Sequence, residues 1–144
     1  MIHAWKISAI MVIIYKISAA DVAKTPVTSS PVPLPSFLAT KTNFTFREGD
    51  LARLECSVDN LSTKKVIWRR KSDPNPLTIG RRTFVEDTRV LVEHAPLQRE
   101  WNLLIKHVRI DDAGMYECQV SSRHKRLRWL VRLNVIRKFR LTSI

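Results

Sequence analysis

The stretch Asp112-Ala113-Gly114-Met115-Tyr116-Glu117-Cys118 decides how this chain folds. A glycine follows two aspartates, and a tyrosine precedes a cysteine by two residues. A tyrosine in this position locks the corner before a strand, because its hydroxyl group bonds to the backbone a few residues upstream. The glycine supplies the backbone freedom that such a corner needs. The stretch therefore predicts a tight turn followed by a buried strand.

Two further residues complete the frame. Cys56 lies on the N-terminal side of Cys118, and Trp68 lies between them. The chain has only two cysteines, so one pairing is possible, and a disulfide requires an oxidising compartment. A disulfide that joins two facing sheets and packs against an indole is typical of immunoglobulin domains. The order Cys, Trp, Tyr, Cys therefore predicts an all-β, V-type immunoglobulin-like sandwich with two antiparallel sheets and one disulfide between them.

The N-terminus has the pattern of a signal peptide. Residues 1–20 combine a basic start, an apolar run over residues 7–15 and small residues at Ser18, Ala19 and Ala20. The apolar run is shorter than the roughly 20 residues that a membrane-spanning helix needs. We therefore expect cleavage after Ala20, a secreted or extracellular chain that can associate with the cell surface, and no membrane span in the mature protein.

The rest of the chain divides by composition. Residues 21–36 are rich in proline, which favours an extended leader without a core. From residue 37 to residue 136, short alternating segments predict a single immunoglobulin-like domain. Residues 137–144 form a basic tail that we expect to be unordered.

Period-two alternation predicts eight strands and the side that each presents to the core. In immunoglobulin lettering they are B (51–58), C (64–71), C′ (76–80), C″ (81–87), D (89–94), E (101–108), F (114–122) and G (127–136). The predicted inward residues are Leu54, Cys56, Val58, Val66, Trp68, Trp101, Leu103, Ile105, Trp129, Val131, Leu133 and Val135. On strand B, Arg53, Glu55 and Ser57 are expected to face water.

One ion pair is expected at the base of the sandwich. The start of strand D lies beside the turn between E and F in this architecture, so Arg89 should meet Asp112, in a structural role. Asp111 and Asp112 are adjacent on a turn and point apart, which argues against a catalytic pair of carboxylates. The four histidines lack metal-ligand spacing, and no phosphate loop or nucleophile motif occurs. We expect no enzyme, no metal and no cofactor.

The charge balance points to acidic partners. The chain has 25 Lys and Arg against 13 Asp and Glu, a formal net charge of +12. A secreted protein rarely meets nucleic acid, so we expect none as partner, whereas sulfated glycans such as heparan sulfate are abundant outside cells. Solubility alone is an equally good explanation of the charge.

Two sequons predict N-glycosylation, at Asn43 and at Asn60. Asn75 is followed by proline and does not qualify. We expect a glycan on Asn43, near the first strand, to lie away from the face made by strands C, F and G, which leaves that face free for contact.

Several segments resemble a known family: Lys-Val-Ile-Trp (65–68), Leu-Thr-Ile-Gly (77–80), Asp-Thr-Arg-Val (87–90), Trp-Asn-Leu-Leu-Ile (101–105) and Asp-Ala-Gly-Met-Tyr-Glu-Cys-Gln-Val (112–120). Together they resemble the first immunoglobulin domain of the defective-proboscis-extension-response proteins and their interacting partners, with lachesin and the IgLON group as relatives. These are neuronal cell-surface recognition proteins, and the likeness covers residues 42–136. The resemblance implies cell adhesion at sites such as synapses, by pairing with another immunoglobulin domain.

In that family the contact face is built from strands C, C′, C″, F and G. The resemblance assigns to it Ile67 and Arg69 on C, Leu77 and Ile79 on C′, Glu117 and Gln119 on F, and Arg128 and Leu130 on G. Two such basic faces would repel each other, which favours a different, acidic partner over self-pairing. Relatives usually continue into further domains and an anchor, whereas this chain ends eight residues after strand G. A short isoform, a truncated gene product, a secreted decoy and an immune-type binding protein therefore stay open as alternatives.

Overall fold

The computed structural model describes residues 30–121 and 127–139. The predicted signal peptide, most of the proline-rich leader and the last five residues of the basic tail lie outside the described residues. The strands of the described part are β1 (Ser36–Leu38), β2 (Asn43–Arg47), β3 (Ala52–Leu54), β4 (Ser57–Asp59), β5 (Val66–Arg70), β6 (Pro76–Ile79), β7 (Arg82–Thr83), β8 (Val90–Glu93), β9 (Asn102–Ile105), β10 (Gly114–Val120) and β11 (Leu127–Ile136). A short 3₁₀ turn, η1 (Ile110–Asp112), precedes β10.

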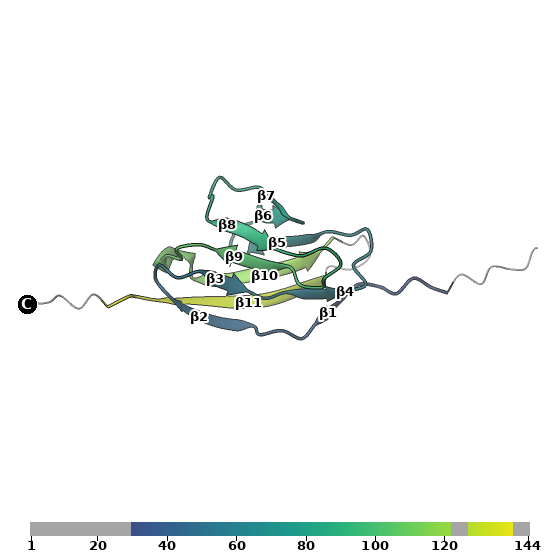
Figure 1. Cartoon of the computed structure of the whole chain (residues 1–144), viewed down its shortest axis with the longest axis horizontal. Helices are drawn as coiled ribbons and strands as arrows, with labels where there is room; N and C mark the ends of the chain where they lie inside the picture. Colours follow the sequence, from purple (N-terminus) through teal and green to yellow (C-terminus); the bar gives the residue numbers. More distant parts are fainter. Residues whose placement is uncertain (1–29, 122–126, 140–144) are drawn as a thin grey trace, which may run out of the picture. The chain divides into compact units, whose positions relative to one another are not determined.

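The larger layer is a six-stranded sheet with the order β2-β11-β10-β5-β6-β7. Figure 1 shows these strands following one another across the domain, from β2 at the lower edge to β7 at the upper edge. Cys118 on β10 lies opposite both Trp68 on β5 and Trp129 on β11. The prediction of purely antiparallel sheets is wrong at one place, because β2 pairs with β11 in parallel. This parallel strand closes the edge of the sheet beside β11.

The second layer contains the three-stranded sheet β3-β9-β8 and, beside it, the pair β1-β4. The predicted single strand over residues 51–58 is interrupted at Glu55 and Cys56, where β3 ends before β4 begins. β4 then pairs with β1, and Ser57 also bridges to Glu100. Because Ser57 is covered from both sides it is buried, and the prediction that it faces water is wrong.

The predicted strand over residues 81–87 is reduced to the two residues of β7. Gly80 makes the tight turn before it with a φ of 58° and donates its backbone N–H to Val66 O. After β7, the Thr83 hydroxyl donates to Val90 O of β8 in the other layer. The chain therefore leaves the six-stranded sheet early, because residues 84–89 cross from one layer to the other.

The core lies between the two layers and contains the predicted inward residues. Leu54, Cys56, Trp68, Leu103, Cys118 and Val131 have no exposed surface. Trp101, Trp129 and Val135 are half-buried and pack against this cluster. The domain also starts slightly earlier than predicted, since Pro35 is buried and β1 begins at Ser36.

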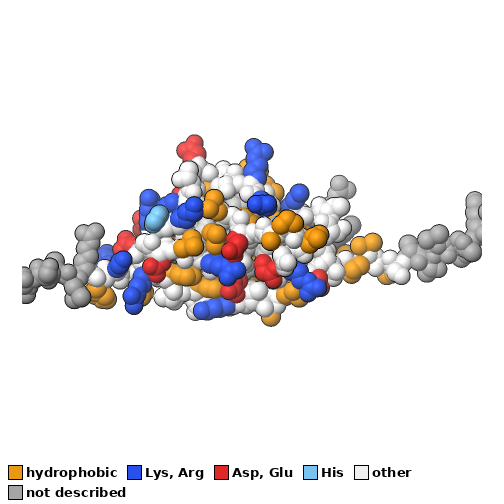
Figure 2. Space-filling view, viewed as in Figure 1, with side chains coloured by type: hydrophobic (Ala, Val, Ile, Leu, Met, Phe, Trp, Pro, Cys, Tyr) orange, Lys and Arg blue, Asp and Glu red, His pale blue; other side chains and the backbone are white. Residues whose placement is uncertain are grey.

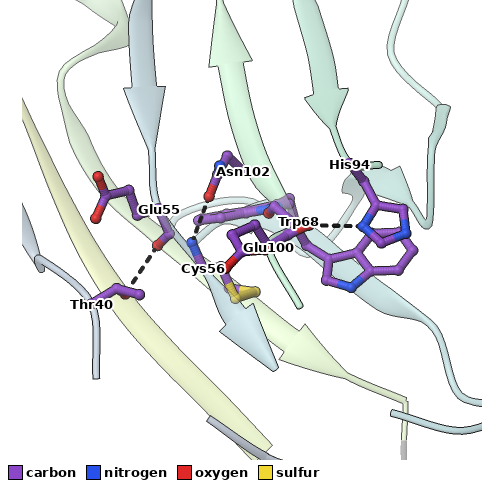
Figure 3. The surroundings of a disulfide bond; sticks show 9 residues. Thr40, Glu55, Cys56, Trp68, His94, Glu100 and Asn102 are labelled. Carbon is purple, nitrogen blue, oxygen red and sulfur yellow. Dashed lines mark hydrogen bonds between the residues drawn. A yellow bond between two sulfur atoms is a disulfide. The ribbon is translucent and has the colours of Figure 1, made fainter. Parts of the chain in front are cut away.

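The predicted disulfide joins Cys56 to Cys118, whose Cα atoms are 6.4 Å apart. The Trp68 indole N–H donates to Trp101 O at 2.7 Å, and the Cys56 N–H donates to the Asn102 side chain at 3.3 Å. Figure 3 shows the Asn102 side chain reaching Cys56 beside the bridge. Closing a loop of this length stabilises the fold by about 4 kcal/mol in the chain-entropy model, so the two layers are held together covalently at the centre of the core.

Candidate recognition face

The base of the sandwich holds the predicted ion pair between Arg89 and Asp112. The Arg89 guanidinium donates to both carboxylate oxygens of Asp112, at 2.7 and 3.1 Å, and to Asp87 Oδ2 at 2.7 Å. Burial on its own would raise the pKa of Asp112, but the hydrogen bonds from Arg89 and from the Arg109 backbone N–H outweigh it and hold that pKa below its usual value. The pair is confirmed, and it closes the turn between β9 and β10.

The predicted tyrosine corner forms at the same place. The Tyr116 hydroxyl donates to Asp112 O at 2.6 Å. Arg70, at the end of β5, donates to that hydroxyl at 3.0 Å and to Asp111 O at 2.8 Å. Burial raises the pKa of Tyr116. The role of Arg70 in the corner was not predicted, and its position at the end of strand C was the only signal in the sequence.

The outer face of the six-stranded sheet carries a shallow concavity of about 350 Å³, formed by β5, β6, β10, the start of β11 and the turn before β6. Five of the eight predicted contact residues line it: Ile67, Arg69, Ile79, Gln119 and Arg128. Four lining residues were not predicted: Pro74, Pro76, Val120 and Ser121. Ile67 and Ile79 lie directly opposite each other on β5 and β6. The lining therefore mixes apolar side chains with two arginines, a glutamine and a serine, and none of the described residues that line it is acidic.

Three predicted contact residues lie elsewhere. Leu77 packs against the core, because the register of β5 with β6 shifts between Trp68 and Arg69 and leaves Leu77 without a direct partner. Leu130 is exposed on β11 but does not line the concavity. Glu117 lies on the outward side of β10, yet it is only 1% exposed. The prediction that Glu117 offers contact surface is wrong, because neighbouring side chains cover it.

Glu117 is the buried centre of a charge cluster beneath the concavity. Its Oε2 atom accepts hydrogen bonds from Arg69 Nε at 2.7 Å and from Gln119 Nε2 at 2.6 Å. A second nitrogen of Arg69 is also 2.7 Å from Oε2, whereas Arg128 Nη1 is 3.8 Å from Oε1. Burial would raise the pKa of Glu117, but these donors outweigh it and lower the pKa. The carboxylate therefore stays ionised and orients its neighbours.

The surface does not carry its basic residues as one uniform layer. Figure 2 shows a face of the domain on which basic, acidic and hydrophobic side chains are intermixed. Exposed arginines are partly paired, as in the contact between Arg53 and Glu93 at 2.7 Å. The formal net charge of the chain thus says little about any single face.

Both sequon asparagines are exposed. Asn60 follows β4 in a turn with a φ of 53°. Asn43 lies on β2 opposite Arg132 of β11, and its Oδ1 accepts a hydrogen bond from Asn134 at 2.6 Å. Asn43 therefore belongs to the same sheet as the concavity. It is two strands from β10 and level with Arg132, about 13 Å along β11 from Arg128. Asn43 is therefore separated from the predicted contact face by distance along this sheet.

The described residues contain no helix that is long and apolar enough to cross a bilayer. In the same part of the chain, no group of three or more His, Cys, Asp or Glu side chains is placed to hold a metal ion.

The sequence and the fold are similar to known proteins. The family described as "Immunoglobulin domain" matches residues 35–122. IgLON family member 5 of Homo sapiens is 37% identical over 84 residues, which cover 58% of this chain and 24% of that protein. The chain spans about a quarter of the length of the curated relatives it matches first.

Two solved structures extend the likeness to the fold. A chain in the crystal structure of Dpr2 Ig1-Ig2 in complex with DIP-Theta Ig1-Ig3 is 39% identical with a TM-score of 0.69, covering 72% of this chain and 48% of that one. A chain in the crystal structure of Dpr1 IG1 bound to DIP-eta IG1 is 34% identical with the same TM-score of 0.69, covering 72% of this chain and 97% of that one. This chain therefore belongs to the immunoglobulin-domain family, among the V-type domains of the neuronal recognition group that includes lachesin, the IgLON proteins and the Dpr and DIP proteins.

Proposed function

We propose that this chain is an extracellular recognition domain that binds an immunoglobulin domain of another cell-surface protein. The contact surface is the outer face of β5, β6, β10 and β11. The observation that carries the proposal is the concavity on this face, where Ile67 and Ile79 are flanked by Arg69 and Arg128. An apolar centre with a charged rim is the usual composition of a protein-binding surface, and arginine is enriched in such surfaces.

The relatives support an immunoglobulin domain as the partner. Dpr1 IG1 was crystallised bound to DIP-eta IG1, and Dpr2 Ig1-Ig2 in complex with DIP-Theta Ig1-Ig3. Each of those complexes joins two different proteins. Pairing of two copies of this chain through this face would oppose two surfaces that each carry the positive charge of Arg128. Because like charges repel across an interface, we propose a different chain as the main partner.

A binding screen tests this function. The domain, produced through a secretory pathway, is measured by surface plasmon resonance against the first domains of Dpr, DIP and IgLON proteins. Ile79→Asp and Gln119→Asp should each weaken binding at least about tenfold, because a carboxylate enters the apolar centre or its rim. Their melting temperatures should stay close to that of the wild type. If the wild-type domain binds none of these proteins, the proposed function is wrong.

A matched substitution on the other layer controls for folding. Leu104 is half-buried on the outer side of β9, in the three-stranded sheet. Leu104→Asp makes the same kind of change as Ile79→Asp but leaves the concavity intact, so binding should persist. If all three variants bind like the wild type, the outer face of the six-stranded sheet is not the contact surface.

Sulfated glycan is the alternative ligand, and the net charge of +12 is the observation that favours it. The apolar pair of Ile67 and Ile79 at the centre of the concavity favours a protein instead. Elution from immobilised heparin distinguishes the two. Elution well above physiological ionic strength supports a glycan role, and elution below it indicates nonspecific attraction.

A further inference from the structure

The two arginines that line the concavity are held very differently. Arg69 is bound to Glu117 Oε2 through two nitrogens at 2.7 Å, and its Nη1 donates to Asp73 O at 3.4 Å. Its side chain is 21% exposed. Arg69 and Glu117 therefore neutralise each other, and the guanidinium of Arg69 is part of the rigid support of the concavity.

Among residues 30–121 and 127–139, Arg128 is held only loosely. Its Nη1 atom is 3.8 Å from Glu117 Oε1, which exceeds hydrogen-bonding distance, and its side chain is 37% exposed. The other oxygen of Glu117 is already occupied by Arg69 and by Gln119, which lies opposite Arg128 in the register of β10 with β11. The Glu117 carboxylate is thus hydrogen-bonded to Arg69 and Gln119. Two arginines face one carboxylate, and Arg128 carries the positive charge that this carboxylate does not neutralise.

We propose that Arg128 is the specificity-determining cation of this face, and that it pairs with a carboxylate of the partner domain beside an apolar side chain seated between Ile67 and Ile79. This inference rests on the proposed function and adds the chemistry of the partner. Both arginines line the concavity, and no acidic residue of the described part of the chain does, so an acidic group on the partner meets no like charge among these lining residues. Because Arg69 keeps its bonds to Glu117, the new ion pair forms at Arg128 without breaking the support beneath it.

Arg132 offers a matched control for Arg128. It is exposed on the outward side of the same strand, four residues further along, or about 13 Å away. That distance exceeds the Debye length of about 8 Å at physiological ionic strength, so Arg132 has little influence on a charge at the concavity. Arg128→Gln and Arg132→Gln remove the same charge from the same strand and differ only in position.

The experiment measures the wild type and both variants against a Dpr, DIP or IgLON first domain that the wild type binds, at 0.05 and 0.5 M NaCl. Arg128→Gln should weaken binding about tenfold at low salt and lose most of the salt dependence, because a close interfacial charge pair is removed. Arg132→Gln should change affinity less than twofold. Melting temperatures of all three proteins should agree closely, since neither side chain is buried.

The outcomes separate the two proposals. Equal effects of Arg128→Gln and Arg132→Gln, or an unchanged salt dependence in Arg128→Gln, would overturn the assignment of Arg128 while the binding function stands. Absence of wild-type binding to every first domain would overturn both. A further variant, Arg128→Glu, should bind more weakly than Arg128→Gln, and equal binding by these two variants would also contradict a partner carboxylate at this position.

Discussion

Two charge clusters in this domain have opposite compositions. The base cluster has one arginine between two carboxylates, and the face cluster has one carboxylate between two arginines. At the base of the sandwich, the Arg89 guanidinium lies between the carboxylates of Asp87 and Asp112 and is 2.7 Å from an oxygen of each. On the outer face, the Glu117 carboxylate lies between Arg69 and Arg128, at 2.7 and 3.8 Å. The first cluster is closed on both sides of its central group. Among the described residues, the second is closed on one side only, by Arg69, and this difference is why we assign the first cluster to holding the fold and propose Arg128 of the second as a contact to a partner.

Strand β10 connects the two clusters. Tyr116 and Cys118 point inward, toward the base cluster and the disulfide, whereas Glu117 between them points outward. All three side chains are nearly fully buried. A strand whose two sides are both anchored is well placed to carry a rigid contact face, because the partner need not order it on binding.

The largest expected effect comes from breaking the base cluster. Arg89→Ala leaves Asp112 without its main partner in a largely buried site, so we expect a loss of about 2 to 3 kcal/mol in the free energy of unfolding. Urea denaturation followed by tryptophan fluorescence measures this loss. A loss below about 1 kcal/mol would show that the cluster is dispensable.

Asp87→Ala is the control for this change. It removes the more exposed of the two carboxylates and keeps the pair between Arg89 and Asp112. The expected loss is about 1 kcal/mol or less, as for a surface pair. Similar losses for Arg89→Ala and Asp87→Ala would contradict the expectation that the pair with Asp112 stabilises the fold more than the pair with Asp87.

The sequence predicted the pair between Arg89 and Asp112 at the base, but it predicted neither the contact of Arg89 with Asp87 nor the burial of Glu117, and the reason is physical. Arg89, Asp112, Tyr116 and the cysteines occupy positions that the architecture requires, so their contacts follow from the fold class. Alternation along β10 assigns Glu117 to the outward side, but it does not indicate whether neighbouring strands cover that side chain. The cover comes from Arg69 on β5 and from Gln119, whose conformations depend on packing between strands.

The interruption of the strand over residues 51–58 has a similar cause. The apolar alternation of Leu54, Cys56 and Val58 is continuous, so the sequence predicts one strand. The break at Glu55 and Cys56 comes from a change of partner, because β3 pairs with β9 while β4 pairs with β1. Pairing between distant segments is not visible in a local pattern.

A smaller effect is expected when the face cluster is altered. Glu117→Gln removes the charge that holds Arg69 but keeps one acceptor oxygen, and the guanidinium of Arg69 can turn toward solvent. We expect a loss of about 1 kcal/mol in the free energy of unfolding, less than for Arg89→Ala. The matched control is Glu93→Gln, at a half-exposed pair with Arg53, which should lose about 0.5 kcal/mol or less. A greater loss for Glu117→Gln than for Arg89→Ala would reverse the comparison.

The smallest effect is the contribution of single carboxylates to acid sensitivity. The pKa values of Asp112 and Glu117 are lowered in the folded domain, so the unfolded chain binds more protons than the folded one below pH about 4. Their stabilisation is therefore fully present near pH 7 and is lost as the pH falls from about 4 through the folded pKa values. Asp112→Asn and Glu117→Gln should each reduce the slope of unfolding free energy against pH in this range, by at most about 1.4 kcal/mol per pH unit. Thermal melts between pH 2 and pH 7 measure it. If Asp112→Asn keeps the wild-type slope, the hydrogen bonds from Arg89 to Asp112 do not form in solution. The proposed contrast between the two clusters would then be wrong.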